Sequence, residues 1–126
     1  MDEKAEYQIS SSVNDGIVEI VMTGELVNSA HDKMSNEVIA ITKDVNYVLV
    51  DIRALKGRLG FTETYERVRN CPPHMYNTHI AMVDILENAD YESFNETTSS
   101  NAGLNLKWFT DIDAARDWLK SKQKKG

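Results

Sequence analysis

Alternation near the start of the chain predicts a β-hairpin. Over residues 7–13, larger apolar side chains largely alternate with polar ones, with a period of two. A stretch rich in β-branched side chains covers residues 17–23. Asn14, Asp15 and Gly16 stand between the two stretches. An Asp-Gly pair supplies the positive φ angles of a tight turn, so we expect two antiparallel strands here.

Two short, nearly continuous apolar runs predict central strands. They cover residues 47–52 and 80–85, and each run is apolar on both faces. Strands of this kind lie in the middle of a sheet, usually a parallel one. In residues 104–108, as in residues 7–13, apolar and polar side chains alternate, so each of these strands has one polar face. We therefore expect these two segments at the edges of the sheet. We therefore expect the strand order to follow the chain order.

Helical spacing of apolar residues predicts four helices. They are expected over residues 29–43, 62–70, 90–102 and from residue 111 onward. Asn28 or Ser29 is the expected N-cap of the first helix, and Asp111 that of the last. Gly103 is the expected C-terminal cap of the third helix. We expect the last helix to end in an irregular lysine-rich tail over residues 121–126.

The order of these elements, β-β-α-β-α-β-α-β-α, predicts an α/β domain. After the opening hairpin the strands run parallel, which gives a mostly parallel five-stranded sheet in sequential order. A chain of 126 residues buries roughly two-thirds of the surface that its unfolded form exposes. No linker or internal repeat divides it, so we expect a single domain over residues 1–126.

Charge and cysteine content narrow the class of protein. The chain has 14 basic and 20 acidic residues, a net charge of −6, which argues against a broad basic face for nucleic acid. The lone Cys71 excludes an internal disulfide framework and fits a reducing compartment. Residues 1–6 do not resemble a signal peptide, and no stretch is apolar for 18 or so residues. We therefore expect a cytoplasmic protein.

The sequence shows no catalytic constellation. The three histidines, at positions 31, 74 and 79, and Cys71 lack the HExxH or CxxC spacing of a metal site. We therefore expect no catalytic residue, no metal and no cofactor. A small enzyme remains the alternative from another class. It would use the strand-end carboxylates of Asp51 and Asp84 beside Arg53.

Residues 53–62 are the most informative segment for binding. They follow a central strand, contain Arg53, Lys56, Arg58 and two glycines, and lead into a helix. A helix N-terminus with free backbone N–H groups is a place for a phosphate or a carboxylate. The nucleotide-binding spacings GxGxxG and GxxxxGK[ST] are absent. The segment therefore serves either in binding an anion or simply in packing its own loop.

The same segment contains apolar side chains that are unusual for an exposed loop. Leu55, Leu59 and Phe61 either pack under the helix that follows or form an apolar lip. Phe61, Tyr65 and Val68 form the expected apolar stripe of that helix. For a lipid-like ligand with an anionic head group, we expect these binding residues: Arg53, Leu55, Lys56, Arg58, Leu59, Phe61 and Tyr65.

Four stretches carry a family resemblance. Residues 16–26, residues 47–57 with the sequence YVLVDIRALKG, residues 80–84, and residues 109–119 with the sequence FTDIDAARDWL resemble the SpoIIAA-like (STAS-like) proteins. The resemblance covers nearly the whole chain. It implies strands in chain order, helices mainly on one face of the sheet, and a non-enzymatic role. Members act as anti-sigma-factor antagonists or as regulatory domains of anion transporters, and the SpoIIAA-like branch also resembles the lipid-binding CRAL-TRIO fold.

One feature of the antagonists differs here. They carry a phosphorylated Ser after an Asp, at the start of the helix that follows the third strand, whereas this chain has Gly60, Phe61 and Thr62. Thr62 is therefore the candidate phosphorylation site of an alternative function, a phosphorylation-controlled anti-sigma-factor antagonist. A phosphate at a helix start is electrostatically favourable.

If the helices cover one face of the sheet, the apolar second face of residues 47–52 and 80–85 requires another cover. Monomers seldom expose large apolar patches, so we expect either a homodimer or a greasy ligand there. The leading functional hypothesis is a non-catalytic regulatory or binding module. It would act through protein partners and through an apolar or lipid-like ligand, with peripheral association with a membrane.

Overall fold

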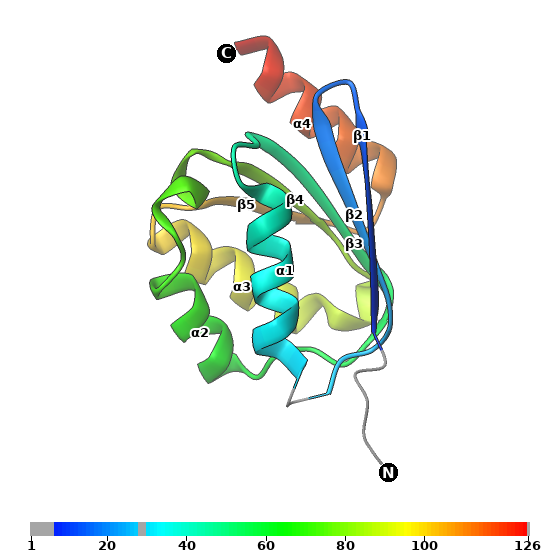
Figure 1. Ribbon diagram of the computed structural model, residues 1–126, viewed down its shortest axis with the longest axis vertical. Coiled ribbons are helices and arrows are strands. Elements are labelled where there is room, and N and C mark those ends of the chain that lie inside the picture. The colour runs from blue at the N-terminus through cyan, green and yellow to red at the C-terminus, as the bar shows by residue number, and fades with distance from the viewer. Residues whose placement is uncertain (1–6, 28–29, 126) are drawn as a thin grey trace.

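The computed structural model describes residues 7–27 and 30–125 (Figure 1). Its principal elements are β1 (Gln8–Asn14), β2 (Ile17–Glu25), α1 (His31–Thr42), β3 (Tyr47–Lys56), α2 (Phe61–Arg69), β4 (His79–Val83), α3 (Ala89–Asn101), β5 (Asn105–Phe109) and α4 (Ile112–Lys125). Short 3₁₀ helices, η2 (Pro73–Asn77) and η3 (Leu86–Asn88), precede β4 and α3. This order confirms the predicted succession of strands and helices.

The five strands form one sheet in the order β1-β2-β3-β4-β5. β1 runs antiparallel to β2, and the remaining neighbours are parallel. The turn between β1 and β2 places Asp15 at φ 53° and Gly16 at φ 80°, as an Asp-Gly turn requires. The predicted sequential, mostly parallel sheet with β1 and β5 at its edges is therefore confirmed.

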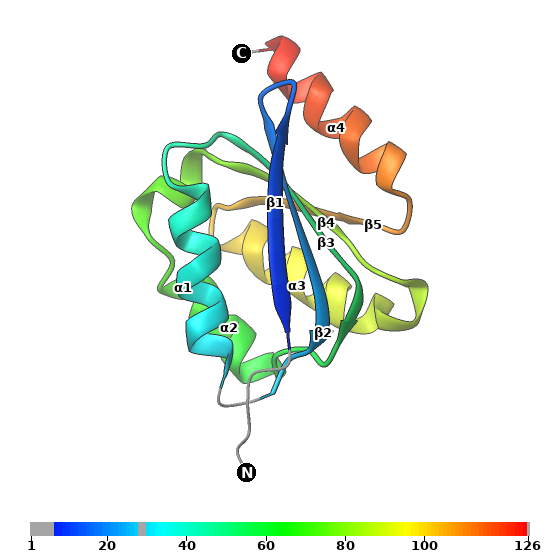
Figure 2. The same ribbon diagram turned by 45° about the vertical axis from the view of Figure 1, so that its right-hand side comes forward.

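Helices α1, α2 and α3 lie on one face of the sheet, and α4 lies on the other (Figures 1 and 2). The first face carries the larger core, in which Ile20 and Val50 of the strands pack with Met34 of α1. On the second face, Leu49 packs with Leu119 of α4 in a separate cluster. The chain thus covers the second face itself. The expectation that this face needs a partner or ligand was wrong. The argument for a homodimer rested on that expectation and therefore no longer holds.

Several local predictions can be checked against the helix ends. Asp111 caps α4, since its Oδ2 accepts a hydrogen bond from the Ala114 N–H at 3.3 Å. Gly103 ends α3 with φ 94°, as expected of a C-terminal cap. The predicted N-caps of the first helix, Asn28 and Ser29, lie outside the described residues. The predicted irregular tail was wrong, because α4 continues to Lys125.

Two features of the segment after residue 52 differ from the prediction. β3 continues to Lys56 and pairs there with β2 beyond a register shift, so Arg53 and Lys56 belong to a strand and not to a loop. In α2 the buried residues are Thr64 and Val68. The predicted stripe was wrong for Phe61 and Tyr65, which are 55% and 50% exposed.

Candidate functional site

A cavity of about 570 Å³ lies between the sheet and helices α1, α2 and α3. Its floor is the apolar face of four neighbouring strands. The floor residues are Met22, Val50, Ile52, Ile80, Met82 and Leu106. Met82 is only half-buried although β4 is an inner strand, because its side chain faces this space. A cavity of this size lies within the range of about 300–1,000 Å³ that small-molecule sites occupy.

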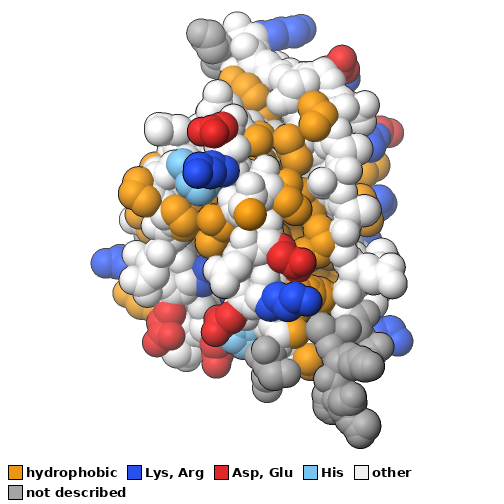
Figure 3. Space-filling model, viewed as in Figure 1, with side chains coloured by type: hydrophobic (Ala, Val, Ile, Leu, Met, Phe, Trp, Pro, Cys, Tyr) orange, Lys and Arg blue, Asp and Glu red, His pale blue; other side chains and the backbone are white. Residues whose placement is uncertain are grey.

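The cavity opens to solvent between α1 and α2. Its lining includes exposed polar residues of α1, such as Asn36, and of α2, such as Glu66. Hydrophobic side chains also remain visible in a band between α1 and β1 (Figure 3). α1 therefore does not close this face of the sheet completely. One side of α1 packs on the core through Met34 and Val38, and Ile39 also lines the cavity.

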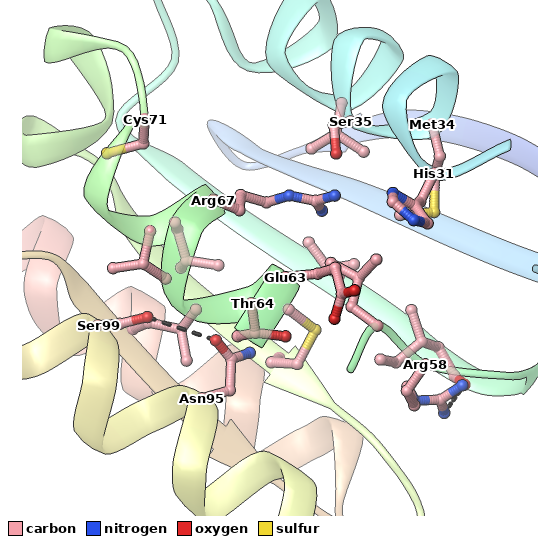
Figure 4. A pocket seen from close by; sticks show the side chains of 18 of the residues that line it. His31, Met34, Ser35, Arg58, Glu63, Thr64, Arg67, Cys71, Asn95 and Ser99 are labelled. Carbon is pink, nitrogen blue, oxygen red and sulfur yellow. Dashed lines mark hydrogen bonds between the residues drawn. The ribbon is translucent and has the colours of Figure 1, made fainter. Parts of the chain in front are cut away.

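Short polar side chains of α3 form the wall opposite the opening. Glu92, Asn95 and Ser99 are buried and lie on one face of α3, because they are three and four residues apart. Asn95 donates to Glu92 at 3.5 Å and accepts from Ser99 at 3.5 Å. All three residues line the cavity (Figure 4 shows Asn95 and Ser99). Long apolar residues here would fill the space, so this polar face helps to keep the cavity open.

A buried ion pair between Arg58 and Asp84 borders the cavity, with Arg58 in the lining. Arg58 donates to Asp84 through two N–H groups, at 3.1 and 2.6 Å. The same guanidinium donates to three backbone carbonyls, those of Ile52, Leu55 and Gly57. Arg58 is 12% exposed and Asp84 is fully buried. Burial raises the pKa of Asp84, but hydrogen bonds, first from Arg58, outweigh it and hold this pKa below its ordinary value.

Glu92 lies next to this ion pair. Burial, and then the hydrogen bond and charge of Asp84, raise the pKa of Glu92 to about 8. With a pKa of about 8, Glu92 is mostly protonated, and therefore neutral, at pH 7. Two carboxyl groups thus share one buried cation, with a single negative charge between them.

The structure brings together only some of the residues expected from the sequence. Leu55 and Leu59 are buried in the cavity lining, and Arg58 borders it. Arg53 instead pairs with Asp51 at 2.9 Å, and its side chain is 41% exposed. Lys56 is exposed.

Phe61 and Tyr65 lie on the outer side of α2. Phe61 packs against two aromatic rings of α3, those of Tyr91 at 6.4 Å and Phe94 at 4.7 Å between ring centroids. Arg69 lies over the Tyr65 ring. Thr62, the second residue of α2, is exposed beside them. These residues form an exposed aromatic surface that is separate from the cavity.

Asp51 and Asp84, the carboxylates of the enzyme alternative, do not meet. Asp51 is two residues after Leu49 in β3, so both side chains lie on the same face of the sheet, the face that α4 covers. Asp51 is near Arg116 of that helix. Asp84 is engaged with Arg58 and with Asn88, at 3.0 Å. Each carboxylate thus has its own arginine, on a different side of the sheet.

Four residues that line the cavity opening were not among the binding residues expected from the sequence. His31 and Ser35 of α1, Arg67 of α2 and Cys71 are all part of the lining (Figure 4). In the sequence, His31 stands among the polar positions of the first predicted helix, and Arg67 resembles any surface cation. The one available signal is the spacing of His31 and Ser35, four residues apart, which places both on one helix face.

Neither a metal-binding cluster nor a membrane-spanning helix is present in the described residues. Within residues 7–27 and 30–125, no group of three or more His, Cys, Asp or Glu side chains is arranged to hold a metal ion. In the same part of the chain, none of the helices combines the length and the apolar character needed to cross a bilayer.

Comparison with known proteins identifies the fold. No protein-family model and no curated protein matches the chain. An anti-sigma factor antagonist from Mycobacterium paratuberculosis superposes with a TM-score of 0.66 at 12% identity, over 90% of this chain and 94% of that one. A DUF3478-family protein with a SpoIIAA-like fold from Shewanella loihica PV-4 superposes with a TM-score of 0.60 at 16% identity, over 94% and 98%. The predicted SpoIIAA-like fold is confirmed.

Proposed function

We propose that this chain is a non-catalytic binding module that holds an apolar, lipid-like ligand in the cavity between α1, α2 and the sheet. The observation that carries the proposal is the cavity itself, about 570 Å³ over an apolar floor. An apolar cavity with a few polar groups at its opening is the usual form of a small-molecule site. An apolar occupant would also make dispersion contacts with the side chains that line the cavity.

Filling the cavity is expected to abolish binding. Met82→Trp places a larger side chain over the centre of the floor, and Ile39→Trp does so from α1. We expect either change to raise the Kd of the neutral fluorescent probe N-phenyl-1-naphthylamine by about tenfold or more, as ~1.4 kcal/mol of lost contact would. The measurement is a fluorescence titration.

Met82→Leu is the matched control, because leucine is also apolar and is small enough to leave the cavity unfilled. It is expected to bind the probe like the unmodified protein. Thermal unfolding shows whether each variant is folded. A folded Met82→Trp protein that binds the probe with unchanged affinity places the probe elsewhere and contradicts the proposal.

A regulatory protein partner is the second candidate function. It is favoured by the exposed aromatic surface of Phe61 and Tyr65, with the Thr62 hydroxyl beside it, in a fold shared with an anti-sigma factor antagonist. A phosphate on Thr62 would add negative charge in the first turn of α2, where the helix dipole favours it. Association with an anionic membrane and homodimerisation also stay predictions.

Phosphorylation of Thr62 can be measured in the protein purified from its own cells. We expect mass spectrometry to find phosphate on the peptide that contains Thr62, and on that residue. Phosphate confined to other hydroxyl groups, or none on the protein, counts against this second candidate and leaves the ligand proposal as it stands.

A further inference from the structure

Arg67 lies at the cavity opening, and its guanidinium has no partner in the described part of the chain. Among residues 7–27 and 30–125, no side chain forms an ion pair or hydrogen bond with its guanidinium. The side chain is half-buried, and this burial lowers the pKa of Arg67 despite the distant charges of Tyr91 and Asp32. Charged groups are rarely removed from water unless they are paired, so a half-buried arginine with no ion pair among the described residues is a candidate site for an anionic ligand group.

Two further polar atoms face the same space from α1. His31 Nδ1 and Ser35 Oγ are buried and have no hydrogen-bond partner in the described part of the chain. Arg67 extends from α2 toward α1, where His31 and Ser35 lie (Figure 4). Three polar groups from two helices therefore converge at the opening. A buried polar atom without a partner destabilises a protein, and a suitable ligand atom would relieve this cost.

The acidic residues around the opening do not neutralise Arg67. The Asp32 side chain is 98% exposed, and its Oδ1 lies 3.9 Å from His31 Nδ1 and not against Arg67. Glu63 turns back toward Gly60 at the start of α2. Glu66 is exposed, and Glu92 on the far wall is neutral at pH 7. Asp32, Glu63 and Glu66 thus share the lining with Arg67, but among the described residues none of them forms an ion pair with its guanidinium.

We infer that the ligand is an amphiphile whose anionic head group, a carboxylate or a phosphate, binds between Arg67, His31 and Ser35, with its apolar chain over the strand floor. A guanidinium matches either anion with two parallel N–H donors, and a serine hydroxyl adds a third. The inference rests on the proposed function and adds the chemistry of the head group to it.

A panel of ten-carbon amphiphiles tests this inference. Decanoate, decyl phosphate, decanol and decyltrimethylammonium, each below its micelle concentration, compete with N-phenyl-1-naphthylamine. We expect one or both of the anionic compounds to displace the probe at concentrations about tenfold lower than decanol, because a hydrogen bond to a charged group is worth roughly that factor. Preference for decanoate indicates a fatty acid, and preference for decyl phosphate a phospholipid-like ligand. Acetate and inorganic phosphate, which lack the chain, are expected not to compete.

Variants of α2 locate the head group. Arg67→Gln is expected to abolish the preference for the anionic compounds over decanol. Arg69→Gln is the matched control, since Arg69 lies over the Tyr65 ring outside the cavity; it is expected to keep the preference. Even if Arg67→Gln does not fold, the panel on the unmodified protein shows whether the cavity prefers an anionic head group.

The outcomes separate the two proposals. If decanol competes as well as both anions, or the cationic compound competes best, the head-group inference is overturned and the proposed function survives. An anion preference that Arg67→Gln leaves intact also overturns it. If no compound displaces the probe and the probe itself does not bind, both proposals fail.

Discussion

Arg58→Met is expected to lower the free energy of unfolding by about 3–5 kcal/mol, the range found when one partner of a buried ion pair is removed. The change leaves the buried Asp84 carboxylate without its cation and removes the donor for three backbone carbonyls. Urea unfolding at pH 7, followed by tryptophan fluorescence, measures the loss. Arg58 thus serves the fold, although the sequence suggested a surface cation for an anionic ligand.

Arg53→Met is the matched control. Arg53 also forms a bidentate pair with a carboxylate, that of Asp51, at 3.0 and 2.9 Å. Its side chain is 41% exposed, so water can solvate the Asp51 carboxylate that the substitution leaves unpaired. We expect a loss of no more than about 1 kcal/mol. Equal losses in the two variants would show that burial of the Arg58–Asp84 pair contributes nothing beyond a surface pair, contrary to this account.

Glu92→Gln is expected to change how stability depends on pH. The folded-state pKa of Glu92 is raised to about 8 from an ordinary value of 4.5. Between those values the folded protein keeps a proton that the unfolded chain releases, so this residue contributes stability that is fully present below pH 4.5 and is lost as pH rises through 8. Gln keeps an amide donor toward Asp84 and has no proton to lose. The variant is therefore expected to match the unmodified protein near pH 5 and to exceed its stability at pH 8.

The measurement is urea unfolding of both proteins from pH 5 to pH 8, compared as a difference at each pH. The difference removes the contribution of His79, whose pKa is lowered chiefly by burial and which acts in the opposite sense. Glu87→Gln, at an exposed position, reports the effect of the substitution itself. A difference between Glu92→Gln and the unmodified protein that stays constant with pH would refute a neutral buried Glu92.

The sheet was predictable because its signals are local. The Asp15-Gly16 turn and the two apolar runs each determine an element within a few residues, and these elements are found where expected. The placement of α1, α2 and α3 on one face of the sheet can also be predicted from the order of the elements. Each connects two adjacent parallel strands, and the right-handed rule for such connections places all three on one face.

The position of α4 was not predictable in the same way. No strand follows it, so the handedness rule does not apply, and only the apolar Ala115 and Leu119 determine where it packs. The partner of Arg58 was equally hidden, because Asp84 is 26 residues away in the chain. The cavity depends on polar residues at buried positions of α3, Glu92, Asn95 and Ser99, which in a sequence resemble a solvated face.

Methyl NMR tests the central claim, that an apolar ligand enters the cavity between α1, α2 and the sheet. Met22, Met34, Met75 and Met82 line the cavity, together with Ile39, Ile52 and Ile80. Ile17 and Ile112 belong to the cluster under α4 and serve as internal controls. On titration of protein carrying ¹³C-labelled Met and Ile methyl groups with decanol, we expect saturable shifts of the cavity methyls, led by Met82 and Ile39. Ile17 and Ile112 are expected to stay in place. The absence of saturable shifts, or shifts confined to Ile17 and Ile112, would contradict the account.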